Sequence, residues 1–419
     1  MIKNYKWYDV LQYLCLLLMA VAIPNFWRWA LWVASLFVIV TIVKIVAQHK
    51  VGNPALDWRL RVALLGPIVY WLVLAISLLW SNDLATGWEV LRLKAVLLIF
   101  PLGFLLSDTS YLTREHLRGV GYALLTGVVG AFLYFLVSAG ISMLQGTEFT
   151  AFKNTFYSHD RAIIYHHAYI ALYAVVAMLF AYHELSSRWH EMKVWHRCLM
   201  IVSLPVLVCY TVLVNSRAGM LAMGLTAFVC VVNFMVVRRN WKLGVGIGVL
   251  AIAVIVAATQ LMPGYVNRIS STVENVEKDA RTSINRANWH AYVKRPAVGY
   301  GVGDYHAVQV GQYETDEFAA GTKAEYNAHN QYMESLLAAG VPAFLAFLFF
   351  MLAPLYMAWR SRSRRLFLVA VLTGIVMFNF LFESMMERQM GLLFIGSLYP
   401  LMVLILSVEE NKFAQSSKS

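Results

Sequence analysis

The stretch Ala328–Pro342, AHNQYMESLLAAGVP, marks the point where a polar segment of the chain becomes an apolar one. From Tyr332 to Met357 the only charged residue is Glu334. A run this long and apolar is typical of a membrane-spanning helix. His329 therefore lies at the N-terminal mouth of a predicted helix, where backbone N–H groups lack partners and the macrodipole is positive. This setting favours a neutral imidazole, which either acts as a general base or simply caps the helix.

The composition extends this interpretation to the whole chain. Of 419 residues, 60% are hydrophobic and only 14% are charged, with a mean hydropathy of +0.62. A soluble chain carries about 25% charged residues. We predict an all-α polytopic membrane protein with about twelve transmembrane helices. These spans cover residues 8–23, 27–47, 62–80, 91–107, 118–144, 162–183, 197–214, 219–237, 243–262, 331–358, 366–382 and 390–408.

The spans suggest one integrated membrane domain. Residues 1–262 hold the first nine helices, 263–330 form one long loop between the ninth and tenth, 331–408 hold the last three, and 409–419 are a polar tail. Of the 34 Lys and Arg residues, 20 fall on one side of the helices, seven on the other and seven in the long loop. The positive-inside rule then places both termini and the tail in the cytoplasm, and the long loop outside.

This topology explains the net charge of +11 without nucleic acid as a partner. It also places four polar segments on the outer face: the turn at 215–219, the long loop, the His329 helix mouth and the stretch 383–389. Their convergence predicts a site at the outer membrane surface, where no nucleotide is normally present.

Three arginines are candidate anion ligands. Arg217 lies in the short turn between the seventh and eighth spans, where it either serves a site or reaches lipid headgroups. Arg281 and Arg286 lie about one and a half turns apart in a predicted helix of the long loop. Either could bind phosphate through its planar guanidinium.

The stretch Arg295–Tyr305, RPAVGYGVGDY, contains G-x-G-x-G but follows no predicted strand, so a dinucleotide site is disfavoured. We interpret its glycines as a tight turn that lets the backbone approach a ligand or the membrane surface.

Other polar residues near the outer face are candidates for supporting roles. His166 and His167 lie at the outer end of the sixth span, where they are either ordinary interfacial residues or substrate contacts. Glu383 and Glu387 are spaced i, i+4 on a predicted helix mouth, where they either orient His329 or pair with an arginine such as Arg388. The chain has no D-x-D pair, so we expect neither a metal nor another cofactor.

Three motifs carry a resemblance to a known family. NSRAGML at 215–221, RPAVGYGVGDY at 295–305 and HNQYMESLLAAG at 329–340 resemble the motifs of the O-antigen ligase and polymerase superfamily. His329, Asn330 and Gly340 match the ligase pattern of His-Asn, nine residues, then Gly. Three positions later the chain has Ala343 where that pattern usually has Gly, Thr or Tyr. SLLWSND at 77–83 and FESMMERQMG at 382–391 also resemble ligase-like members.

The resemblance implies a glycosyltransferase of the bacterial inner membrane with a periplasmic site. Its donor would be an undecaprenyl-pyrophosphate-linked glycan, and a ligase would use lipid A–core as the acceptor. His329 resembles the base and Arg217 the first diphosphate-binding arginine. Arg281 resembles the second, with Arg286 as the alternative. Arg286, Asn330, Glu383 and His167 join the expected substrate site.

The alternatives are a polysaccharide polymerase, a protein O-oligosaccharyltransferase and, from a different class, a lipid or polysaccharide transporter. A transporter should show pseudo-symmetric halves and polar residues at the membrane midplane. The polar residues here gather at one surface, and no internal repeat is visible, so the sequence favours an enzyme.

Overall fold

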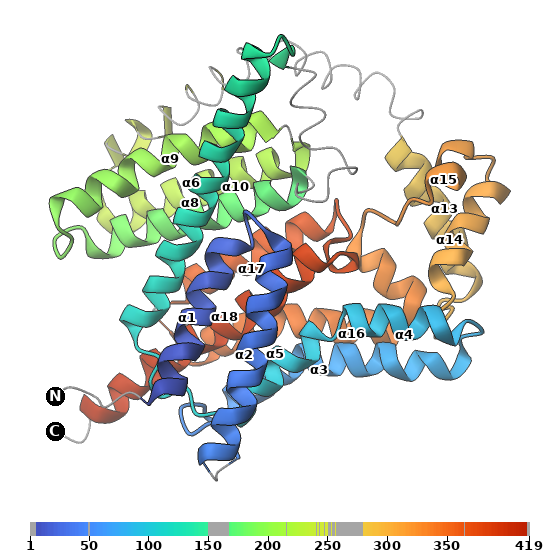
Figure 1. Ribbon diagram of the computed structural model, residues 1–419, viewed down its shortest axis with the longest axis horizontal. Coiled ribbons are helices and arrows are strands. Elements are labelled where there is room, and N and C mark those ends of the chain that lie inside the picture. The colour runs from blue at the N-terminus through green and yellow to red at the C-terminus, as the bar shows by residue number, and fades with distance from the viewer. Residues whose placement is uncertain are drawn as a thin grey trace.

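The structure is a computed structural model in which helices are joined by turns and short loops (Figure 1). It describes residues 6–48, 51–149, 167–214, 216–239, 241–242, 244–246, 248–249, 253, 256, 280–363 and 365–416. None of these residues forms a strand. The predicted all-α class is therefore confirmed for the described part of the chain.

Seven described helices are long and apolar enough to cross a membrane. They are α2 (Trp27–Gln48), α3 (Trp58–Ile76, continued by the 3-10 turn η1, Ser77–Trp80), α6 (Arg114–Leu144), α8 (His167–Arg188), α9 (Val194–Val214), α10 (Arg217–Arg238) and α16 (Gln331–Arg360). Four further helices overlap other predicted spans and have shorter apolar stretches: α1 (Trp7–Ala22), α5 (Val96–Leu106), α17 (Leu366–Phe380) and α18 (Gln389–Ser416), whose apolar part is Gln389–Ile405. The ninth predicted span, 243–262, lies mostly outside the described residues, so the count of twelve stays a prediction.

Two predicted spans are interrupted, which the sequence analysis missed. The fourth, at 91–107, is divided into α4 (Leu84–Leu93) and α5, because the chain turns at Lys94. The tenth, α16, leaves helical geometry at Ala339 (φ −141°, ψ 26°) and Gly340 (φ 65°, ψ −154°). Each break has a polar or backbone partner from another segment, as described below.

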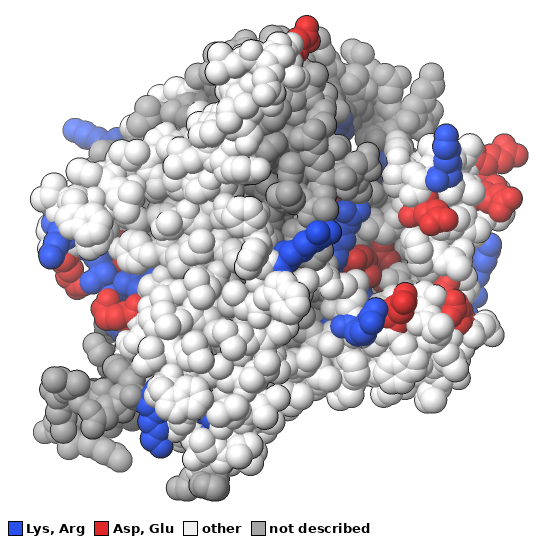
Figure 2. Space-filling view, viewed as in Figure 1, with Lys and Arg blue, Asp and Glu red and all other residues white. Residues whose placement is uncertain are grey.

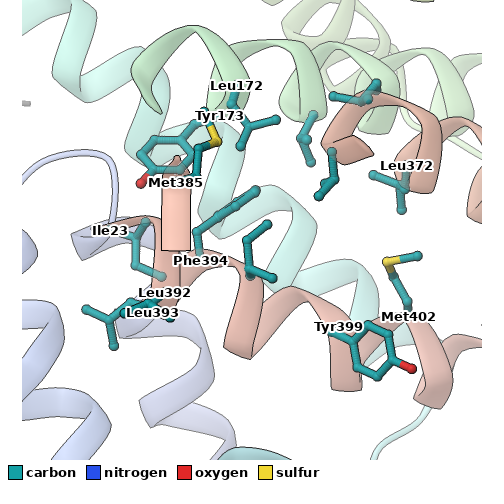
Figure 3. Packing of buried hydrophobic residues seen from close by; sticks show 14 of the residues in the cluster. Ile23, Leu172, Tyr173, Leu372, Met385, Leu392, Leu393, Phe394, Tyr399 and Met402 are labelled. Carbon is teal, nitrogen blue, oxygen red and sulfur yellow. The ribbon is translucent and has the colours of Figure 1, made fainter. Parts of the chain in front are cut away.

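The apolar core lies where α18 meets helices from both ends of the sequence (Figure 3). Tyr173 of α8 packs its ring 4.6 Å from that of Phe394 in α18. Helix α16 packs along α3, where Gly66 allows the backbone of Phe350 to approach closely. Helix α1 begins and α18 ends on the same side of the molecule (Figure 1).

The segment between α10 and α16 contains a small helical lobe, formed by α13 (Ala280–Lys294), α14 (Tyr305–Thr315) and α15 (Ala319–Ala324). Ile284, Ala287 and Tyr313 form its own core, covered by Phe318 and Tyr326. Figure 1 shows this lobe beside the N-terminal end of α16 and away from α8, α9 and α10. The predicted amphipathic helix around Arg281 and Arg286 is α13.

Candidate functional site

Helix ends from distant parts of the chain meet around the start of α16. The backbone N–H of Asn330 donates to Ser384 Oγ at 3.1 Å, which joins the start of α16 to the segment before α18. At the start of α18, the Tyr173 hydroxyl of α8 donates to the Met390 carbonyl oxygen at 3.2 Å. Helix α10 touches α8 where a Cβ on Gly219 would lie 2.2 Å from that of Ala171. These contacts bring the helix ends that carry His167, Arg217, His329 and Glu383 to one end of the helix bundle. That this end is the outer face stays a prediction.

His329 directly precedes the cap of α16. Its backbone has φ 47°, and its N–H donates to Asn327 Oδ1 at 3.1 Å. The Asn330 side chain caps the helix, because its Oδ1 accepts from the N–H groups of Tyr332 and Met333. The expectation that His329 faces unpaired helix N–H groups is therefore wrong for these two groups, since the neighbouring asparagine satisfies them.

The imidazole of His329 faces a buried carboxylate. Its Nδ1 lies 3.4 Å from Glu383 Oε2, and the side chains of His329 and Glu383 are 26% and 5% exposed. When Nδ1 carries the hydrogen that Glu383 accepts, Nε2 keeps its lone pair. The half-buried ring can then receive a proton from a group at the surface. Of the alternatives for Glu383, the structure shows the contact with His329.

The predicted i, i+4 helical spacing of Glu383 and Glu387 is wrong. Residues 381–382 form a turn, 383–384 have no regular secondary structure, and Met385–Glu387 form one 3-10 turn, η3. The two carboxylates therefore contact different partners. Glu387 binds Lys94, with Nζ 2.6 Å from Oε1, a partner that the sequence did not indicate.

Glu387 is the centre of a buried hydrogen-bond network. Its carboxylate accepts from the Tyr305 hydroxyl at 2.8 Å and from Gln331 Nε2 at 3.1 Å, in addition to Lys94. Burial acts to raise the pKa of Glu387, but the Lys94 ammonium and these hydrogen bonds outweigh burial and hold it below its usual value. Beside it, the buried carboxylate of Glu334 accepts from the N–H of Ala328 and from Ser384 Oγ.

The glycine-rich stretch packs against the break in α16. The N–H groups of Tyr300 and Gly301 donate to the carbonyl oxygens of Leu337 and Ala338, each at 2.8 Å. A Cβ on Gly340 would lie 2.4 Å from the Ala297 oxygen, so only glycine permits this contact. The glycines thus bring the lobe against the chain's own backbone. We had expected these glycines to let the backbone approach a ligand or the membrane surface; in the structure they let it approach the backbone of α16.

The motifs at 77–83 and 295–305 also meet. The carboxylate of Asp304 accepts from the backbone N–H groups of Asn82 and Asp83, at 2.7 and 2.9 Å. Ser77 Oγ accepts from the N–H of Val302 at 2.9 Å. Both motifs therefore position the lobe on the membrane helices.

The two lobe arginines lie on different faces of α13. Arg281 precedes the buried residues Ile284 and Asn288 by three and seven positions, so it starts the inner face of the helix. This face packs towards the chain that leads to His329, because Asn288 Nδ2 donates to the Tyr313 hydroxyl, which in turn donates to the Asn327 oxygen. Arg286 is exposed on the outer face. The geometry favours Arg281 over Arg286.

Arg217 is the first residue of α10 and is exposed, directly after the cap Ser216. Its guanidinium and the positive end of the α10 macrodipole attract anions together. Figure 2 shows basic and acidic side chains gathered in the recess between the lobe and the rest of the molecule. His167 starts α8 at the same end, whereas His166 lies outside the described residues.

Lys94 was not among the predicted site residues, although the sequence contains a signal for it. Two basic residues, Arg92 and Lys94, interrupt the predicted span near its start, in the stretch LRLKAVLLIF at 91–100. A charged side chain within a predicted span usually has a buried partner. Glu334 and Ser384 were passed over as well, because only the fold brings their hydrogen-bond partners together.

Within the described ranges, no group of three or more His, Cys, Asp or Glu residues is arranged to hold a metal ion. Residues 199–348 match the family model described as O-antigen ligase. The match supports membership of the O-antigen ligase-like superfamily over this part of the chain. The matched region contains Arg217, Arg281, Arg286, His329 and Asn330, whereas Glu383 lies beyond it. No curated protein matches the chain.

The apolar helices and the O-antigen ligase match together support a multi-pass membrane protein, and the match broadly supports a ligase- or polymerase-type function. Such proteins act on polysaccharide and lipid-linked substrates.

Proposed function

We propose that the protein is an O-antigen ligase of the bacterial inner membrane, which transfers a glycan from undecaprenyl pyrophosphate to a hydroxyl of lipid A–core. The observation that carries this proposal is the contact between His329 and the buried Glu383, with His329 inside the O-antigen ligase match. Both termini would be cytoplasmic and the site periplasmic.

In the proposed reaction, His329 is the general base. Glu383 holds Nδ1, so Nε2 accepts the proton as the acceptor oxygen attacks the anomeric carbon. The new carbon–oxygen bond forms while the bond from the anomeric carbon to the pyrophosphate oxygen breaks. Attack opposite the leaving group inverts the anomeric configuration. General-base assistance of this kind contributes about 10²–10⁴-fold.

Arginines would stabilise the leaving group. Pyrophosphate departs as an anion, so the reaction needs positive charge where that anion forms. Arg217, at the positive end of α10, and Arg281, on the inner face of α13, are suited to this role, and Arg286 is the alternative to Arg281. Two guanidinium groups would supply the charge that a divalent metal supplies elsewhere. His167 and Asn330 would border the substrate.

The second candidate is a polymerase of the same superfamily, in which the acceptor is another lipid-linked repeat unit. Ala343 favours it, because this position departs from the ligase pattern and is fully buried. A protein O-oligosaccharyltransferase would use the same donor and base with a protein hydroxyl acceptor.

The test is deletion of the gene, followed by gel analysis of the cell's glycolipids. A ligase predicts free lipid A–core together with retained lipid-linked polymer. Core that carries a single repeat unit would identify a polymerase. A normal glycolipid pattern, with unglycosylated cell-surface protein, would identify a protein glycosyltransferase.

A further inference from the structure

Lys94 is a buried lysine close to the candidate site. Its side chain is 2% exposed, and it lies at the turn between α4 and α5. The Nζ atom donates to the Met386 carbonyl oxygen at 2.9 Å and binds Glu387 at 2.6 Å. Both partners belong to η3, almost 300 residues later in the chain. A buried ammonium is costly unless its partners are well placed, so the contact fixes η3 against α4 and α5.

The same contact extends to the catalytic candidates. Gln331 joins η3 to the start of α16, because its Nε2 donates to Glu387 and its Oε1 accepts from the Met386 N–H at 2.8 Å. Ser384 Oγ accepts from the Asn330 N–H and donates to Glu334 Oε1 at 3.0 Å. These bonds hold two short segments side by side.

The two segments are 327–331 and 383–387, and each carries one member of the His329–Glu383 pair. The distance between the His329 imidazole and the Glu383 carboxylate therefore depends on how the two segments lie against each other. Lys94 supplies the charge that lets the Glu387 carboxylate remain ionised within this network. Without that charge, the buried carboxylates of Glu387 and Glu334 would repel each other.

We propose that Lys94 is a positioning residue for glycosyl transfer, which holds the 383–387 segment against the start of α16 so that Glu383 faces His329. The expected effect on kcat rests on the proposed function. Lys94 is too buried to meet the substrate, so it acts through Glu387 and Met386. Its loss should therefore lower kcat and leave the KM for the donor nearly unchanged.

The experiment compares Lys94→Met with the double variant Lys94→Met/Glu387→Gln. Removing one partner of a buried ion pair leaves an uncompensated charge, whereas removing both leaves neutral groups of similar size. Small misplacement of catalytic groups lowers rates by about 10²-fold. We expect Lys94→Met to lower kcat by this factor. The kcat of the double variant should be about tenfold higher than that of Lys94→Met.

Lys44 provides a matched control. It is also a fully buried lysine in an ion pair, with Nζ 2.7 Å from Asp9 Oδ1, but it lies near the opposite end of α5. Helix α5 has 11 residues and is about 16 Å long. Lys44→Met should lower stability while the folded fraction keeps its kcat.

A second measurement does not depend on transfer. Diethyl pyrocarbonate modifies accessible histidines, and mass spectrometry reads the rate at His329 alone. We expect this rate to change at least threefold in Lys94→Met and to stay at the wild-type value in Lys44→Met. An unchanged rate at His329 would overturn the positioning role, as would an unchanged kcat in Lys94→Met. If the folded wild-type protein transfers no glycan, the proposed function fails, and the labelling rates still decide the role of Lys94.

Discussion

Substitution of Gly340 by alanine tests how the break in α16 supports the candidate site. Gly340 has φ 65° and ψ −154°, a region that is almost exclusive to glycine. A Cβ there would lie 2.4 Å from the Ala297 oxygen and 2.5 Å from its carbonyl carbon. Both atoms are backbone, so no side-chain rotation can relieve the overlap.

The expected magnitude has two parts. Placing a non-glycine residue in this backbone region costs about 1–3 kcal/mol. Forcing an extra methyl group into close-packed surroundings costs about 1–3 kcal/mol more. We therefore expect Gly340→Ala to lower the free energy of unfolding by about 2–6 kcal/mol. The change would also push residues 295–301 away from α16 and disturb the hydrogen bonds of Tyr300 and Gly301.

The assay is an unfolding titration of the purified protein in detergent, combined with glycan transfer by the folded fraction. Gly374 of α17 is the matched control, because a Cβ there meets nothing within 4 Å. Gly374→Ala should be neutral or stabilise the helix by up to about 1 kcal/mol. Equal stability of the two variants would refute the reasoning about the break in α16.

Three further predictions concern charge. Arg217→Ala and Arg281→Ala should each weaken binding or turnover of the pyrophosphate donor by at least tenfold, and the lysine variants should recover little because the planar fork is lost. A silent Arg281→Ala with a harmful Arg286→Ala would transfer the role to Arg286. Transfer by the reconstituted enzyme should be undiminished in excess EDTA without nucleotide; activity that EDTA removes and magnesium restores would contradict the arginine mechanism. The pKa of Glu387 is lowered on folding, so its stabilisation is complete above its ordinary value of 4.5 and is lost as the pH falls through the lowered pKa. Glu387→Gln should therefore reduce the loss of stability below pH 4.5, and an identical acid-unfolding profile would contradict the network.

The sequence was sufficient for the fold class because membrane spans are a local signal. Each is a run of apolar residues, and the position of His329 before such a run places it at a helix mouth. The breaks at Lys94 and Gly340 depend on distant partners, Glu387 and Ala297. Periodicity and hydropathy do not report contacts across such distances, so both breaks were missed.

The same distinction applies to the candidate site. The His-Asn motif indicated His329, and the cost of an arginine at a membrane boundary indicated Arg217. The orientation of side chains was less predictable. Glu383 and Glu387 are separated by a turn that a helical spacing rule cannot foresee. The preference for Arg281 over Arg286 came from the resemblance, and only the fold shows which of the two lies on the buried face of α13.

The central claim is that His329 is the base in glycan transfer from a lipid-linked pyrophosphate donor. The most direct measurement is single-turnover transfer by purified wild-type protein and by His329→Ala, with lipid-linked glycan and lipid A–core as substrates. The account predicts product from the wild type, and from the folded variant a transfer rate about 10²–10⁴-fold lower with donor binding retained. Transfer by His329→Ala at the wild-type rate would contradict it.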